Sequence, residues 1–407
     1  MSSTPFSSRR RAMSTVLLAG IAAGACAVLP SPAVADGPGS GTPSAVSVGD
    51  SYISGEGGRW AGNSNDSSSR TDALGSTAYY DNAAGTGEEI VRCHRSKAAE
   101  EHIGGGVVSK NLACSGATTS TTNGDTFKPG IDFYNGAGGQ GQALMLQNWA
   151  ATHNVKMVNL SIGGNNFNFA SIVQSCVVDF LTSPSWWKDY CNDDSSVQAN
   201  FTAANITAQT TAIKNAILNV RTAMSNAGYA ASQYAIVVQD YESPLPTSSG
   251  MRYGQSGYTR QNTGGCGFYD NDLNWANNTA LPTINSAVRN AVTQSGLSNV
   301  KLLELQSTFN GRRLCENTVG LLEEKGLATW QSAGAVDNSE WVEQIRTAST
   351  VFGPYFVQES LHPNYWGEKA LRNCIRQVWN GGTPRGGTCS RLSNGLNASG
   401  EPNMGLS

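Results

Sequence analysis

The chain has 407 residues, of which 14% are charged, and its net charge at pH 7 is −3. A balance so close to neutral argues against a nucleic-acid partner and against a membrane surface held by electrostatic attraction. The 46 glycines indicate long ordered surface loops.

The first 35 residues predict a signal peptide. Arg9, Arg10 and Arg11 form a positive start, residues 16–29 are almost wholly apolar, and residues 33–35 read Ala-Val-Ala, a small-x-small cleavage site. The apolar run is too short to span a bilayer comfortably. We therefore expect a secreted, extracellular protein whose mature chain covers residues 36–407. The export route, general secretory or twin-arginine, stays open.

Strands and helices are predicted to alternate along the mature chain. Short runs rich in β-branched residues predict strands at residues 45–48, near 106–108, and at 155–162, 234–239 and 300–306. Helical spacing predicts helices at residues 143–152, 197–227, 281–293 and 364–378, the last with Pro363 just at its start. This alternation indicates the doubly wound α/β class, with a parallel sheet covered on both faces. Residues 167–196 and 242–273 are expected to be loop-rich insertions.

The cysteines predict disulfides. Nine are present, and removal of Cys26 with the signal peptide leaves eight, an even number in an exported chain. Sequence alone permits many pairings, with free core thiols as a further alternative. The nearest-neighbour solution staples four separate loops: Cys93–Cys114, Cys176–Cys191, Cys266–Cys315 and Cys374–Cys389. No cysteine or histidine spacing supports zinc, so we expect no metal and no other cofactor.

Ser51 is the first candidate for chemistry. It stands in Gly49-Asp50-Ser51-Tyr52, directly after the first predicted strand. Ligands bind beyond the carboxyl ends of parallel strands, where such a Ser can be exposed with its backbone N–H pointing the same way. The tetrapeptide alone is also ordinary turn chemistry.

Two further loops carry candidate donors to an oxyanion. Gly116, in Cys114-Ser115-Gly116-Ala117, follows the second predicted strand, and its N–H can approach a ligand closely. Asn165 follows the strand at residues 155–162 and offers an uncharged side-chain amide. Such an amide stabilises an oxyanion by about 3–4 kcal/mol in a well-studied protease. The structural alternatives are a turn beside a disulfide and an Asn-rich loop.

His362 is the candidate general base among the four histidines. His102 lies in a stretch that is expected to be solvated, His153 closes a helix, and His94 is expected to be structural. Only His362 has a carboxylate, that of Glu359, three residues before it and a position at the start of a helix. Activity is expected to be lost as the pH falls through the histidine pKa, about 6–7.

These four elements, in this order, resemble the SGNH or GDSL-type hydrolase family, which is named for one Ser, Gly, Asn and His from four separated blocks. The resemblance spans about residues 45–379 and is closest to secreted, disulfide-bearing actinobacterial esterases and phospholipases. It implies a single domain over residues 36–407, built as a flavodoxin-like three-layer sandwich around a mostly parallel five-stranded sheet. Tyr52 replaces the Leu of the family name and Asn166 replaces a mainly structural Asp, so neither change is expected to matter much.

The resemblance also implies a role for each site residue. Ser51 is the nucleophile, and its N–H, the Gly116 N–H and the Asn165 side-chain amide form the oxyanion hole. His362 takes the Ser51 proton and passes it to the leaving alcohol. Glu359 stands where the family often has Asp and has one extra methylene. The partner of His362 is therefore either the Glu359 carboxylate or, as in some relatives, a main-chain carbonyl nearby.

The family, the export signal and the eight cysteines together favour a phospholipase B or A-type enzyme that releases fatty acids from glycerophospholipids. The alternatives are a general carboxylesterase, a carbohydrate deacetylase and, from another class, a non-catalytic lipid-binding or cell-wall-binding protein. We expect a monomer with no nucleic-acid partner and with transient contact to a lipid surface. Seven side chains of the first insertion are candidates either for an acyl groove or for core packing: Phe167, Phe169, Val177, Phe180, Trp186, Trp187 and Tyr190.

Overall fold

The computed structural model describes residues 36–184, 186–346 and 354–407. The predicted signal peptide, residues 1–35, therefore lies outside the described residues. None of the helices in the described ranges is long and apolar enough to cross a bilayer.

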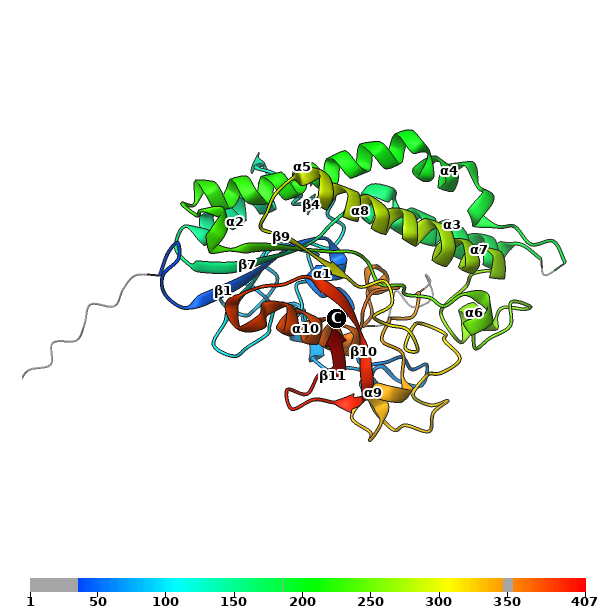
Figure 1. The fold of residues 1–407 in the computed structure, drawn as a ribbon. Coiled ribbons are helices and arrows are strands. Elements are labelled where there is room, and N and C mark those ends of the chain that lie inside the picture. The colour runs from blue at the N-terminus through cyan, green and yellow to red at the C-terminus, as the bar shows by residue number, and fades with distance from the viewer. Residues whose placement is uncertain (1–35, 185, 347–353) are drawn as a thin grey trace, which may run out of the picture. The chain divides into compact units, whose positions relative to one another are not determined.

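The centre of the fold is a seven-stranded sheet (Figure 1). Five of its strands pair in parallel: β1 (Pro43–Gly49), β2 (Val108–Asn111), β7 (Asn154–Ser161), β8 (Ala235–Gln239) and β9 (Val300–Glu304). Numbered along the chain, these five are ordered 2-1-3-4-5 across the sheet, which is the flavodoxin-like order. The predicted doubly wound α/β class with five parallel strands is thus confirmed.

Two strands beyond the prediction extend this sheet. β10 (Gly387–Leu396) pairs in parallel with β9 over two residues, and β11 (Pro402–Leu406) pairs antiparallel with β10. Most residues of β10 are exposed or half-buried, so this strand lacks the apolar run that marks a buried strand. The sequence pattern therefore gave no strand after the last helix.

Helices cover both faces of the sheet (Figure 1). α2 (Gln142–Ala150), α5 (Ala203–Asn226) and α8 (Leu281–Ser295) pack together above it, and α10 (Tyr365–Trp379) lies below. Side chains alternate between the two faces of a strand. Val46 accordingly belongs to the core under α5, and Ala45 to the core that contains the apolar residues of α10. The sandwich has two cores, one on each side of the sheet.

The first predicted insertion is only partly a loop. Residues 169–182 form a 14-residue helix, α3 (Phe169–Thr182), whose apolar side chains recur at helical spacing, so its prediction as loop was wrong. The region 242–273 is mostly irregular. The remaining short elements are β3 (Thr122–Asn123), β4 (Phe127–Lys128), β5 (Asn135–Gly136), β6 (Gly139–Gln140), α1 (Ser51–Ser54), α4 (Ser195–Gln198), α6 (Thr259–Asn262), α7 (Asp270–Trp275) and α9 (Ala335–Asn338).

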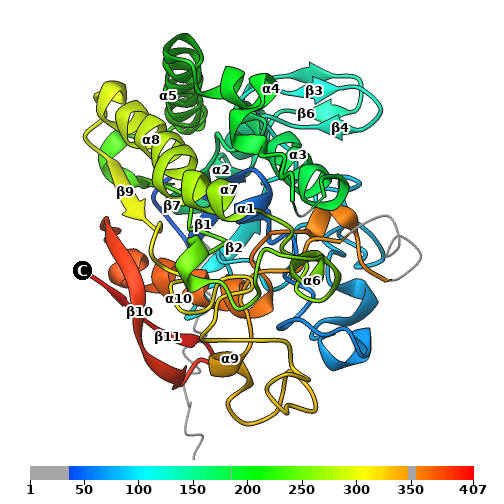
Figure 2. The same ribbon diagram turned by 90° about the vertical axis from the view of Figure 1, so that its right-hand side faces the viewer.

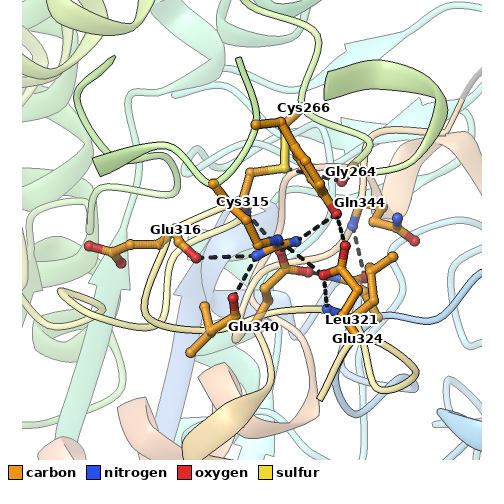
Figure 3. Close-up of polar contacts among 12 residues, drawn as sticks. Gly264, Cys266, Cys315, Glu316, Leu321, Glu324, Glu340 and Gln344 are labelled. Carbon is orange, nitrogen blue, oxygen red and sulfur yellow. Dashed lines mark hydrogen bonds and ion pairs between the residues drawn. A yellow bond between two sulfur atoms is a disulfide. The ribbon is translucent and has the colours of Figure 1, made fainter. Parts of the chain in front are cut away.

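All four predicted disulfides are formed. Figure 3 shows the Cys266–Cys315 disulfide together with Glu316, Glu324 and Glu340. These three glutamates all contact the guanidinium of Arg252. That guanidinium lies 2.8 Å from a Glu340 carboxylate oxygen and 3.1 Å from one of Glu324. The Arg252 backbone N–H also donates to the Cys315 carbonyl oxygen. The second insertion is therefore tied to the segment that runs past Glu340.

Candidate active site

Ser51 is the first residue of helix α1, directly after strand β1. The side chain of Asp50 caps this helix, because it accepts a hydrogen bond of 3.1 Å from the Tyr52 N–H. The other Asp50 carboxylate oxygen accepts one of 2.5 Å from the Tyr241 hydroxyl. Burial raises the pKa of Asp50 to about 7, against these two bonds. The first N–H groups of a helix have no partner within it, so the Ser51 N–H is a donor beside its own hydroxyl.

His362 contacts Ser51 although 311 residues separate them. The Nε2 atom of His362 lies 2.7 Å from the Ser51 Oγ, and its Nδ1 lies 2.9 Å from the Ser360 carbonyl oxygen. Because a carbonyl oxygen only accepts, the Nδ1 carries the proton and the Nε2 is free to accept the one on Ser51. This is the geometry in which a serine hydroxyl is activated for nucleophilic attack.

The structure places the Glu359 carboxylate away from His362. This side chain is buried and accepts three hydrogen bonds, from the Tyr79 hydroxyl (2.6 Å), the Trp60 indole N–H (2.9 Å) and the Phe356 N–H (2.9 Å). These contacts contradict Glu359 as the partner of the histidine. The main-chain alternative is the one observed, with the carbonyl oxygen of Ser360.

The loop that carries His362 is held from two sides. The Tyr52 hydroxyl donates to the Leu361 carbonyl oxygen at 2.9 Å, and the Tyr52 ring centroid lies 4.9 Å from that of His362. On the other side, the Glu343 N–H donates to the His362 carbonyl oxygen, and the Leu361 N–H donates to that of Glu343. Leu361 has a φ of +61°, in the left-handed region that a side chain of this kind rarely adopts. The surrounding contacts therefore determine where the imidazole lies.

Gly116 and Asn165 line the same cavity as Ser51 and His362. Gly116 has a φ of +80°, which a residue with a side chain would adopt only with strain. Asn165 begins the turn after β7, and one N–H of its side-chain amide donates to the Ala117 carbonyl oxygen at 2.9 Å. An amide nitrogen carries two hydrogens, so Asn165 retains a second donor. The structure thus brings together all four residues of the predicted blocks.

Sequence reasoning missed a buried pair behind this site. The Glu56 carboxylate lies 2.7 Å from the His94 Nδ1, and both side chains are almost fully buried. Although burial opposes both charges, the pairing outweighs it, so the pKa of His94 is raised and that of Glu56 is lowered. The Gln358 amide donates to Glu56 at 2.9 Å and to the Ser115 hydroxyl at 2.8 Å. The pair therefore braces the loop that leads into Gly116.

The cavity has a volume of about 730 Å³ and a mainly apolar wall. Helix α3 supplies one side of it with seven residues, all apolar except Gln174: Phe169, Ala170, Val173, Gln174, Val177, Val178 and Leu181. From Phe169 to Leu181 this wall measures about 18 Å at 1.5 Å per residue. That length is similar to one leaflet of a bilayer core, about 15 Å.

The seven candidates for an acyl groove divide into three groups. Phe169 and Val177 line the cavity, as one of the two interpretations predicted. Phe167 and Phe180 are buried in the packing, as the other predicted. Tyr190 packs on Tyr269, and Trp186 and Trp187 are exposed to solvent.

No protein-family model matches the chain, and no curated protein matches it either. The similar solved structures include an extracellular lipase from Streptomyces rimosus, at 18% identity and a TM-score of 0.45, covering 84% of this chain and 100% of that one. They also include phospholipase A1 from Streptomyces albidoflavus NA297, at 18% identity and a TM-score of 0.43, covering 84% and 99%. Est24, a carbohydrate acetylesterase from Sinorhizobium meliloti, has 11% identity and a TM-score of 0.30, with 69% and 92% covered.

Proposed function

We propose that the chain is a secreted serine ester hydrolase of the SGNH type, which releases fatty acids from glycerophospholipids through an acyl-enzyme on Ser51. The observation that carries the proposal is the 2.7 Å contact between the Ser51 Oγ and the His362 Nε2 in a cavity with an apolar wall. The pair supplies a nucleophile with its base, and the cavity supplies room for an acyl chain.

The reaction begins when the Ser51 Oγ attacks the ester carbonyl carbon and His362 takes the hydroxyl proton on its Nε2. The negative charge on the carbonyl oxygen is met by the N–H groups of Ser51 and Gly116 and by the Asn165 amide. His362 then gives its proton to the leaving alcohol. Water repeats the sequence on the acyl-enzyme and releases the fatty acid.

The Ser360 carbonyl oxygen orients His362, which is the role that a carboxylate has in a Ser-His-Asp triad. By accepting the Nδ1–H at 2.9 Å it fixes the tautomer in which the Nε2 can receive a proton. Its dipole also stabilises the imidazolium that forms during attack, though less than a full negative charge does.

The charges in the cavity support a phospholipid over a neutral ester. Lys128 and Arg346 line it. The Lys128 side chain lies close to Gly116, since a Cβ added to that glycine would be 3.5 Å from it. Two carboxyl groups line it as well, those of Asp50 and Glu242. Burial raises their pKa values to about 7 and about 8, so at neutral pH Asp50 is only partly ionised and Glu242 is mostly neutral, which reduces their repulsion of a phosphate.

The other readings fit the cavity less well. A carbohydrate deacetylase does not need the apolar α3 wall, which would lie against a polar sugar with Gln174 as its one polar side chain. A lipid-binding protein has no use for a Ser–His contact at 2.7 Å. The four disulfides support export, because such bonds persist in oxidising compartments. We propose that the enzyme acts as a monomer.

The test is fatty-acid release from phosphatidylcholine in mixed micelles by the purified mature protein, with the Ser51→Ala variant as control. Release of both acyl chains with glycerophosphocholine, identified by mass spectrometry and absent from the control, supports a phospholipase B. Release of one chain places the enzyme in the A type. Cleavage of a short nitrophenyl ester without release from phospholipid overturns the lipid substrate and retains the Ser51 chemistry.

A further inference from the structure

The loop after α3 exposes two adjacent tryptophans. Trp186 is 82% exposed and Trp187 is 71% exposed, and their rings meet edge to face with centroids 6.5 Å apart. Large apolar side chains that are exposed side by side indicate a surface that binds a protein, a membrane or a ligand. Indole rings are typical of lipid interfaces, because their bodies are apolar and their N–H can reach polar headgroups.

The loop is anchored where it leaves the cavity wall. Leu181, one turn before it, lines the cavity, and the Ser183 hydroxyl lies 2.8 Å from that of Tyr269. The Cys176–Cys191 disulfide closes the two ends of the segment. The tryptophans therefore extend from a fixed base at the end of the α3 wall.

Exposed apolar side chains also border the mouth of the cavity, on α3 before this loop and at Val357. Val178 of α3 is 47% exposed and Val357 is 51% exposed, and both also line the cavity. Phe356, next to Val357, is 43% exposed. Figure 2 shows α3 and the short orange helix at Val357–Glu359 on the side that faces the viewer. Apolar side chains thus border the mouth from both segments.

We propose that Trp186, Trp187, Val178, Phe356 and Val357 form a docking surface for the surface of a lipid aggregate. The inference rests on the proposed lipolytic function and goes beyond it, since it concerns how the enzyme reaches its substrate. Val178 and Val357 belong both to this surface and to the cavity, so an occupant of the surface also covers the cavity mouth. A protein partner in that place would block entry of the substrate, whereas a lipid layer is the source of the acyl chain.

Binding is tested without hydrolysis, in the Ser51→Ala background, with vesicles of phosphatidylcholine. We expect the Ser51→Ala protein to sediment with the vesicles, and the added Trp186→Ala and Trp187→Ala changes to weaken binding at least tenfold. The matched control is Leu392→Ala on β10, which removes a side chain that is 75% exposed but does not line the cavity. Equal binding by the double variant and its parent overturns the docking surface.

Activity gives a second readout, the ratio of turnover on micellar phosphatidylcholine to turnover on a soluble short-chain ester. We expect the tryptophan pair variant to lower this ratio at least tenfold and Leu392→Ala to leave it unchanged. An equal loss on both substrates overturns the proposal, because it indicates damage to the site. A third outcome also overturns the proposal: the parent protein forms a concentration-dependent dimer and does not bind vesicles, and the tryptophan pair variant is monomeric. The exposed surface would then join two copies of the chain. Absence of any Ser51-dependent hydrolysis overturns the proposed function instead, and the vesicle assay still decides the docking surface.

Discussion

The Nδ1 of His362 lies 2.9 Å from the carbonyl oxygen of Ser360, two residues before it in the chain. The orienting partner of the imidazole is therefore part of its own loop, and no distant carboxylate has to be brought to it. A carbonyl dipole stabilises the imidazolium less than a carboxylate charge would. In return, the imidazole and its partner are positioned together, because Tyr52 and Glu343 hold the loop that carries both from two sides.

Glu359→Gln is expected to keep kcat within about tenfold of the wild type, because the carboxylate does not contact His362. The same change should lower the free energy of unfolding by about 1–3 kcal/mol, because it disturbs buried hydrogen bonds from Tyr79 and Trp60. Both values follow from kcat per active site, titrated with a fluorophosphonate, and from urea unfolding. His362→Ala is the comparison, with an expected loss on the order of 10⁶-fold. A loss of that size in Glu359→Gln would show that the Glu359 carboxylate is the partner of His362 after all.

Asn165→Ala is expected to lower kcat by about 10²–10³ with little change in KM, because the amide meets charge that develops only in the transition state. Asn166→Ala is the matched control. The Asn166 side chain contacts Thr119 and Gln209 and is not among the residues that line the cavity. This control should lose stability and keep most of its kcat. Equal kcat losses in the two variants would remove Asn165 from the oxyanion hole.

The acid limb of the pH–rate profile is expected below pH 6.5, the ordinary pKa of histidine. Burial lowers the pKa of His362, and the nearby Glu56 charge acts against that effect while His94 acts with it. Because the neutral imidazole is the active form, a lowered pKa keeps the enzyme active to lower pH. Glu56→Gln removes the opposing charge and, with it, the support for a charge on His94. Because the Glu56 effect on His362 is the larger of the two, the limb should still move to lower pH. The measurement is kcat/KM from pH 4 to 9 in both proteins, and an upward shift in the variant would refute the role of Glu56.

Tyr52→Phe is expected to lower kcat about fivefold, which corresponds to the roughly 1 kcal/mol of one hydrogen bond. The change removes the donor to the Leu361 carbonyl oxygen and keeps the ring against His362. KM for a short ester should not change, because the hydroxyl orients the base and does not bind the acyl chain. Unchanged kcat in this variant would show that the other contacts suffice to hold the loop.

Periodic apolar runs made most of the fold predictable. Four of the five parallel strands, β1, β7, β8 and β9, carry the apolar runs that predicted them. β2 is mostly polar and begins at Val108, where the strand predicted near residues 106–108 ends. Strand β10 escaped because its residues are largely exposed. Helix α3 was not predicted, because the cysteines and the loop-like composition around it suggested an insertion. Its apolar residues nevertheless keep helical spacing.

The site was predictable at the level of residue types and not at the level of contacts. Ser51, Gly116, Asn165 and His362 stand in blocks of recognisable pattern, and they do line one cavity. Which oxygen meets the His362 Nδ1 depends on how the loop folds at Leu361, and no residue pattern encodes that. The Glu56–His94 pair was missed for the same reason, since 38 residues separate its members.

In the proposed reaction Ser51 is the nucleophile and His362 activates it. The most direct test is reaction of the mature protein with a fluorophosphonate, followed by intact-mass and peptide mass spectrometry. We predict one adduct per chain, on the peptide that contains Ser51, and a rate of labelling that falls at least a thousandfold in His362→Ala. An adduct on another residue, or hydrolysis that persists in a protein fully labelled at Ser51, would show that Ser51 is not the nucleophile.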